Sequence, residues 1–312
     1  MAEADAISHG GGARPGAVAI WIQAIRAPSL SAAAIPVLMG VAVAARAGSF
    51  SFPRMILALI GAMAIQAGTN LINDYYDFRS GADSEESLGP SMVIQRGLLS
   101  ADQVWRGGIA AFAIGAAIGL LLVYLCGWPI LAIGIPSVAA GYFYTASPVS
   151  LAYVALGELT VFIFMGPAIV VGAYFVMALH FSWTALWASI PLGFLVAGIL
   201  HANNIRDIES DTRHGKRTLA TMLGREGANY ELIALDALAY ATTIAAVLAH
   251  ALPWIALAVF ITIPRAIDQI RIMTRENEPK KLNLGLFRSI QLHMEFGLLM
   301  TAAFLIAAFF NW

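Results

Sequence analysis

Charged residues are scarce in this chain. Asp, Glu, Lys and Arg make up 12% of its 312 residues, whereas they make up about 25% of a typical soluble domain. Hydrophobic residues account for 59%. This composition excludes an ordinary soluble protein and indicates a polytopic membrane protein whose main surroundings are the lipid bilayer.

Cysteine and basic clusters are also nearly missing. Cys126 is the only cysteine, which excludes disulfides within the chain and cysteine-based metal sites. No Lys/Arg cluster extends beyond a short loop, so a nucleic-acid partner is excluded. Residues 1–16 are rich in Gly and Ala and lack the apolar core of a signal peptide, and we expect a disordered tail there. Residues 17–312 then form one transmembrane domain.

Long apolar runs dominate the rest of the chain. About 20 apolar residues cross a bilayer as a helix, and on that measure the sequence predicts an all-α protein with nine transmembrane helices. The expected spans are residues 30–45, 55–74, 105–125, 129–144, 156–178, 186–204, 233–250, 254–273 and 291–310.

Two polar, acid-rich stretches interrupt this pattern, and each follows a long apolar segment. Charged groups at membrane depth are costly, so such residues predict a functional site. Helical residues three or four apart share a face. The acids and amides of each stretch should therefore form one stripe along the surface of its helix. The stripes consist of Asn70, Asn73, Asp74 and Asp77, continued by Asp83, and of Asn203 or Asn204, Asp207 and Asp211.

Facing each other, the two stripes would gather at least four carboxylates, which repel one another unless cations are present. Ligands made only of oxygen favour a hard cation, and Mg²⁺ is the expected one because it shares carboxylates with phosphate oxygens. Basic residues surround the acids, as a diphosphate would require; they are Arg79, Arg96, Arg206, Arg213, Lys216 and Arg217. An apolar cavity behind such a head group would suit a polyprenyl diphosphate.

The same stretches resemble a known family. Residues 70–83 (NLINDYYDFRSGAD) and 203–220 (NNIRDIESDTRHGKRTLA) are similar to the two Asp-rich motifs of the UbiA superfamily of intramembrane prenyltransferases. Residues 24–40, 93–100, 142–148 and 156–167 support the resemblance, which extends over most of the chain from Trp21. It is closest to the MenA branch, the 1,4-dihydroxy-2-naphthoate polyprenyltransferases of menaquinone synthesis.

The resemblance implies a UbiA-like bundle with its active site on the cytoplasmic side, Mg²⁺ as cofactor, and polyprenyl diphosphate and an aromatic acceptor as substrates. The expected metal ligands are Asp74, Asp77, Asp83, Asp207 and Asp211. The expected catalytic residues are Asn70, Asn73, Asp74, Tyr144 and Asn203. The expected substrate-binding residues are Arg79, Arg96, Lys216, Arg217 and Glu158.

Several assignments stay open at this stage. Tyr144 suits either the site or an interfacial aromatic belt, and Glu158 suits either substrate contact or a structural pair. His201 is expected to be a hydrogen-bonded core histidine, and Arg265 is expected to pair with Asp268, three residues on. Arg26 is an interfacial anchor or a partner for the acceptor carboxylate. The competing functions are prenylation of another acceptor such as 4-hydroxybenzoate, a cation or phosphate transporter, and a metal-dependent scaffold.

The distribution of basic residues predicts the orientation in the membrane. With a cytoplasmic N-terminus, the inner segments hold fifteen Lys and Arg residues, and the outer segments hold only Arg46 and Arg54. Positive charge favours the cytoplasmic side, which in a bacterium is the inner face of the plasma membrane. A topology reporter fused after Trp312 should therefore report a location outside the cytoplasm, and a cytoplasmic signal would contradict the predicted topology.

Overall fold

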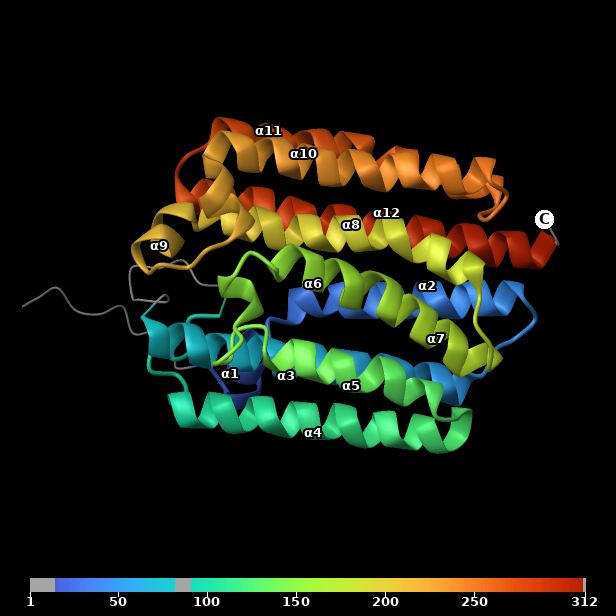
Figure 1. Ribbon diagram of the computed structural model, residues 1–312, viewed down its shortest axis with the longest axis horizontal. Coiled ribbons are helices and arrows are strands. Elements are labelled where there is room, and N and C mark those ends of the chain that lie inside the picture. Colours follow the sequence, from blue (N-terminus) through green and yellow to red (C-terminus); the bar gives the residue numbers. More distant parts are fainter. Residues whose placement is uncertain (1–14, 82–90, 311–312) are drawn as a thin grey trace, which may run out of the picture.

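The computed structural model describes residues 15–81 and 91–310, which form a bundle of helices lying roughly side by side (Figure 1). The helices are α1 (Ala17–Ala24), α2 (Ser31–Arg46), α3 (Phe52–Ser80), α4 (Ala101–Cys126), α5 (Pro129–Tyr142), α6 (Gly157–Ile163), α7 (Ile169–Ala178), α8 (Trp183–Arg206), α9 (Ile208–Arg213), α10 (Leu219–Leu248), α11 (Ile263–Arg275) and α12 (Pro279–Phe310). These residues contain no β-ladder, only an isolated bridge between Val154 and Arg217. The all-α class is confirmed. Asp83 and most of the predicted tail lie outside the described residues.

Seven helical stretches in the described part are long and apolar enough to cross a membrane. They are Ala27–Arg46, Phe52–Ser80, Ala101–Cys126, Gly157–Ala178, Trp183–Arg206, Leu219–Leu248 and Pro279–Phe310. The other two predicted spans also fall on helices, but α5 has only 14 residues. Residues 254–262 form a 3-10 helix that leads into the charged helix α11. The count of nine spans therefore stays a prediction.

Both acid-rich stretches lie at one end of the bundle, opposite the C-terminal end of α12 (Figure 1). The described part of the first stretch is the last part of α3 and its cap Gly81, where φ is 78° and a side chain would be strained. The second stretch covers the end of α8 and all of α9, which are separated only by Asp207. The chain thus brings two distant segments together.

Helix α2 runs through the core of the bundle, and small residues allow its neighbours to approach closely. A Cβ added at Gly40 would lie 2.3 Å from the Val170 backbone oxygen in α7. On the other side, a Cβ at Gly297 of α12 would lie 2.1 Å from Ile35 Cγ2. Without an aqueous driving force between helices, such close packing supplies much of the association energy in a membrane.

The predicted pair between Arg265 and Asp268 is wrong. Arg265 Nη2 instead lies 2.8 Å from Glu295 Oε1, and Arg288 Nε lies 2.9 Å from Asp268 Oδ2. Both ion pairs join α11 to α12. These helices pack against each other, and each contributes one acid and one arginine, which lie opposite a residue of the other charge. Glu295 thus has its partner on α11.

The close approach at Gly40 yields a stability prediction. Gly40→Ala should lower the thermal unfolding midpoint in detergent, because the new methyl group meets backbone atoms that cannot move aside; overpacking typically costs about 1–3 kcal/mol. Gly119→Ala in α4 is the control, since a Cβ there meets nothing within 4 Å. Equal midpoints for the two variants would contradict the close packing of α2 on α7.

Candidate functional site

A cavity of about 1180 Å³ opens among the helix ends that carry the two acid-rich stretches. Side chains from α3, α8, α9 and the connectors line it, together with the beginning of α12. The polar lining includes Arg26, Asn70, Asn73, Asp77, Tyr144, Asn203, Asn204, Arg206, Asp207, Asp211 and Lys216. Most of the predicted site residues therefore meet in one place.

The first stretch is held by the connector that follows α1. Asn70 Nδ2 donates to the Ile25 carbonyl oxygen at 2.9 Å and to Ser29 Oγ at 3.0 Å. Asp74 is buried, and its two oxygens accept hydrogen bonds from Arg26 and Ser91. It does not line the cavity, so its predicted role as a metal ligand stays a prediction, and in this structure it anchors Arg26.

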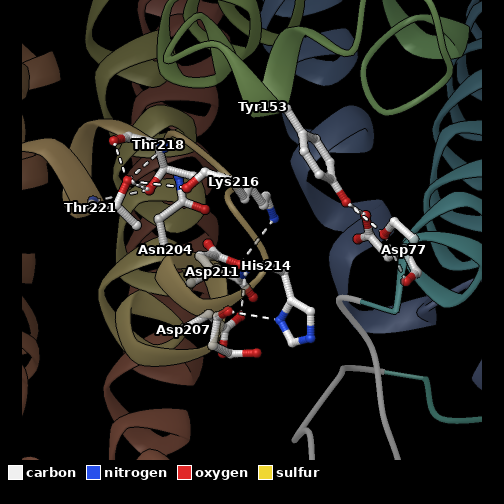
Figure 2. Close-up of polar contacts among 12 residues, drawn as sticks. Asp77, Tyr153, Asn204, Asp207, Asp211, His214, Lys216, Thr218 and Thr221 are labelled. Carbon is white, nitrogen blue, oxygen red and sulfur yellow. Dashed lines mark hydrogen bonds and ion pairs between the residues drawn. The ribbon is translucent and has the colours of Figure 1, made fainter.

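Asp77 reaches the cavity from the next turn of α3 (Figure 2). The hydroxyl of Tyr153, from the connector after α5, donates to Asp77 Oδ1 at 2.8 Å. Ser80 Oγ lies 3.1 Å from the same hydroxyl. Burial and the charge of Asp77 raise the pKa of Tyr153 above its ordinary value, so Tyr153 stays a hydrogen-bond donor at neutral pH.

In the second stretch, a buried arginine organises the end of α8. Arg206 Nε donates to Asp207 Oδ1 at 2.7 Å, and Nη2 donates to Asp207 Oδ2 at 2.5 Å. Nη1 donates to Asn283 Oδ1 at 2.6 Å, and Nη2 also donates to Asn203 Oδ1 at 2.9 Å. The guanidinium thus joins the second stretch to the beginning of α12.

Asp211 in α9 faces Lys216, whose Nζ lies 3.5 Å from Asp211 Oδ1 (Figure 2). Burial raises the pKa of Asp211 to about 6, although Lys216 opposes the rise. Burial works against a charged Lys216, yet Asp77 and Asp211 more than offset it and raise the pKa of Lys216. The lysine is therefore charged at neutral pH.

Four predicted substrate-binding residues do not line the cavity. Arg79 is exposed and donates to the Tyr75 hydroxyl at 3.0 Å, and Arg96 is exposed on the turn before α4. The side chain of Arg217 is exposed, while its main chain bridges to the connector at Val154. Glu158 is buried and does not line the cavity. Their contacts with substrate stay predictions, as does the role of Asp83.

Glu158 and His201 form a buried network beneath the second stretch. Glu158 Oε1 accepts from Asn204 Nδ2 at 2.9 Å and lies 3.1 Å from His201 Nδ1. His201 Nε2 lies 2.8 Å from the Ala228 carbonyl oxygen in α10. His201 is thus a hydrogen-bonded core histidine, as expected. Tyr144 is buried, and it lies in the cavity wall.

Sequence reasoning missed Tyr153, Ser91 and Asn283, all of which contact residues of the acid-rich stretches. Ser91 and Asn283 carry no signal of their own, because serine and asparagine are common in connectors and helix ends. Tyr153 lies between two segments that support the family resemblance, residues 142–148 and 156–167, and belongs to neither. Its position depends on which connectors meet, and a sequence pattern does not contain this information.

The donors in the cavity suit a hard divalent cation. Carboxylate and amide oxygens predominate, and Asp211 Oδ2 and Asn73 Oδ1 are buried with no hydrogen-bond partner in the described part of the chain. No three His, Cys, Asp or Glu side chains among the described residues form a ready metal cluster. Mg²⁺ needs only one or two carboxylates, with waters and phosphate oxygens completing its shell. The residues therefore fit Mg²⁺ bound together with a phosphate ligand.

The Arg206 fork yields a prediction. Arg206→Lys should lower the thermal unfolding midpoint by several degrees, because a lysine cannot make two parallel bonds to Asp207 and still reach Asn283. Arg225→Lys is the control, since Arg225 pairs with Glu209, whose side chain is 61% exposed, and exposed pairs contribute about 1 kcal/mol or less. A similar midpoint for both variants would contradict the organising role of Arg206.

Known proteins resemble this chain over most of its length. The 1,4-dihydroxy-2-naphthoate octaprenyltransferase of Bacillus subtilis (strain 168) is 31% identical, over 93% of each chain. The Mycobacterium tuberculosis protein of the same name is 34% identical, over 75% of this chain and 79% of the relative. A UbiA homologue from Archaeoglobus fulgidus, solved with GPP and Mg²⁺ bound, has the same fold, with a TM-score of 0.62, 17% identity and coverage of 91% and 99%.

The model of the UbiA prenyltransferase family matches residues 33–291. This match begins in α2 and ends in α12, so it includes both acid-rich stretches and every helix between them. The chain therefore belongs to the UbiA prenyltransferase family.

Proposed function

We propose that this prenyltransferase transfers a polyprenyl group from polyprenyl diphosphate to 1,4-dihydroxy-2-naphthoate in a Mg²⁺-dependent reaction. The acceptor is supported by the names of the bacterial relatives at 31% and 34% identity. The diphosphate and the metal are supported by the GPP and Mg²⁺ bound to the archaeal homologue. Family membership favours this function over a transporter or a scaffold.

The observation that carries the proposal is that the cavity of about 1180 Å³, whose lining includes many charged and polar residues and which is here called the polar cavity, lies next to an apolar one. A second cavity of about 190 Å³ lies between α2, α3, α5 and the α6–α7 segment, and its lining is mostly apolar. Gln66, Thr69, Tyr144, Val161 and Met165 line both cavities. We assign the polar cavity to the diphosphate and the apolar one to the first part of the prenyl tail.

The residues of the polar cavity divide into metal-binding and phosphate-binding groups. Asp77, Asp207 and Asp211 would hold Mg²⁺, with Asp83 and Asp74 as further candidates, and Lys216 would bind diphosphate oxygens directly. When bound, Mg²⁺ supplies positive charge that stabilises the departing diphosphate. Lys216 adds a further fixed positive charge there. Tyr144, at the junction of the cavities, would present its ring to the allylic carbon as the C–O bond breaks.

The acceptor would lie beside the allylic carbon. Arg26 lines the cavity and would neutralise the acceptor carboxylate. Its ion pair with Asp74 would hold the guanidinium group in place. The new C–C bond forms at the ring carbon that bears the carboxylate, CO₂ leaves from that carbon, and diphosphate departs with the electron pair of the broken C–O bond. Because CO₂ leaves in place of a proton, the ring carbon needs no general base. Asn70, Asn73 and Asn203 would orient the two substrates by hydrogen bonding.

We place this cavity on the cytoplasmic side of a bacterial inner membrane, in a single domain of nine spans that starts at residue 17. The basic residues support this orientation, because most of them lie in the segments at the bundle end that carries the acid-rich stretches. The family match over residues 33–291 supports a single domain.

The test is an acceptor assay with purified enzyme in detergent. The protein should convert 1,4-dihydroxy-2-naphthoate and a polyprenyl diphosphate to a product whose mass shows gain of the prenyl group and loss of CO₂. Added EDTA should abolish turnover and excess Mg²⁺ should restore it. Product from 4-hydroxybenzoate but not from dihydroxynaphthoate would contradict the acceptor, and turnover in EDTA would contradict the metal.

A further inference from the structure

Tyr153 contacts both acid-rich stretches, although it belongs to neither of them. It ends the short turn Leu151–Tyr153 in the connector between α5 and α6. It does not line the polar cavity itself. Its side chain instead contacts residues that form the cavity wall. Two residues that do line the cavity, Asp77 and Lys216, are its neighbours (Figure 2).

The hydroxyl of Tyr153 contacts the first stretch. It donates to Asp77 Oδ1 at 2.8 Å, and Ser80 Oγ lies 3.1 Å away from it. In the described part of the chain, Asp77 has no basic partner within ion-pair distance. The tyrosine hydroxyl therefore fixes one carboxylate oxygen and leaves the other available to the cavity.

The ring of Tyr153 contacts the second stretch. Lys216 Nζ lies 5.3 Å from the ring centroid, which is within the range of a cation–π interaction. Because a lysine side chain has many rotamers, a ring on one side restricts the positions of its ammonium group. Contacts to the ring and to Asp211 together direct Nζ into the space between the two stretches.

The main chain fixes the tyrosine to the same segment that carries the lysine. The Arg217 backbone N–H donates to the Tyr153 carbonyl oxygen at 3.3 Å, and the Ala155 N–H donates to the Arg217 carbonyl oxygen at 2.7 Å. These bonds form the bridge between Val154 and Arg217. A movement of either connector would therefore displace the other.

We propose that Tyr153 is a positioning residue that aligns the metal-binding carboxylate of Asp77, through its hydroxyl, with the diphosphate-binding ammonium group of Lys216, through its ring. This inference rests on the proposed function, because it assigns Asp77 to the metal and Lys216 to the diphosphate. The two roles use different parts of one side chain, so two substitutions separate them.

The experiment uses the full-length protein in detergent and two readouts. One is the Kd for Mn²⁺ without substrate, measured by electron paramagnetic resonance of free Mn²⁺. The other is the KM for the polyprenyl diphosphate at saturating metal. Tyr153→Phe should raise the Mn²⁺ Kd about tenfold, as expected when the charged carboxylate of Asp77 loses a hydrogen bond, and should leave the KM within about twofold. Tyr153→Leu should raise both quantities.

Two further variants make the outcome decisive. Tyr240→Phe is the control, because it loses a 2.7 Å contact with Thr262 Oγ1 elsewhere in the bundle; it should change neither readout. Asp77→Asn is the reference, and it should raise the Mn²⁺ Kd more than Tyr153→Phe does. If Asp77→Asn weakens Mn²⁺ binding and Tyr153→Phe does not, the inference is overturned and the proposed function stands. If Asp77→Asn leaves the Mn²⁺ Kd unchanged, the assigned metal site itself is overturned.

Discussion

The rest of this structure depends on neutralising carboxylates that lie at the ends of apolar helices. An isolated charge there is costly, and three of the four aspartates in the described parts of the two stretches have a basic partner. Arg26 pairs with Asp74, Arg206 with Asp207, and Lys216 with Asp211. Asp77 has a tyrosine hydroxyl instead. Asp77 is thus the one of these four aspartates without a basic partner, which favours an incoming cation at the side of the cavity where Asp77 lies.

These partners come from outside the helical stripes that carry the acids, and they determine how the helix ends are connected. Arg26 precedes α2, and Lys216 lies in the connector before α10. The charge requirements of Asp74 and Asp211 therefore fix a connector against the end of a helix, whereas Arg206 belongs to α8 itself. Connectors thus complete a cavity that is lined mainly by helices, and they supply Arg26, Tyr144 and Lys216 among its polar residues.

Sequence reasoning was most successful where a physical rule acts locally. Apolar length predicted the all-α bundle and the seven long spans, and the costly charges at helix ends predicted that two distant stretches share one site. It failed where the outcome depends on contacts between helices. Arg265 and Asp268 are three residues apart, yet both prefer partners on α12. Asp74 shares a stripe with Asp77, yet Arg26 and Ser91 hold it behind the cavity wall.

The central position of α2 has a consequence for how the protein is made. Translation proceeds from the N-terminus, so α2 leaves the ribosome before its neighbours α7 and α12, which come later in the chain. Until they arrive, the glycine face of α2 at Gly40 can only face lipid or other proteins in the membrane. The core is therefore completed around a central helix that is made before its neighbours, and it closes only after α12 has been inserted.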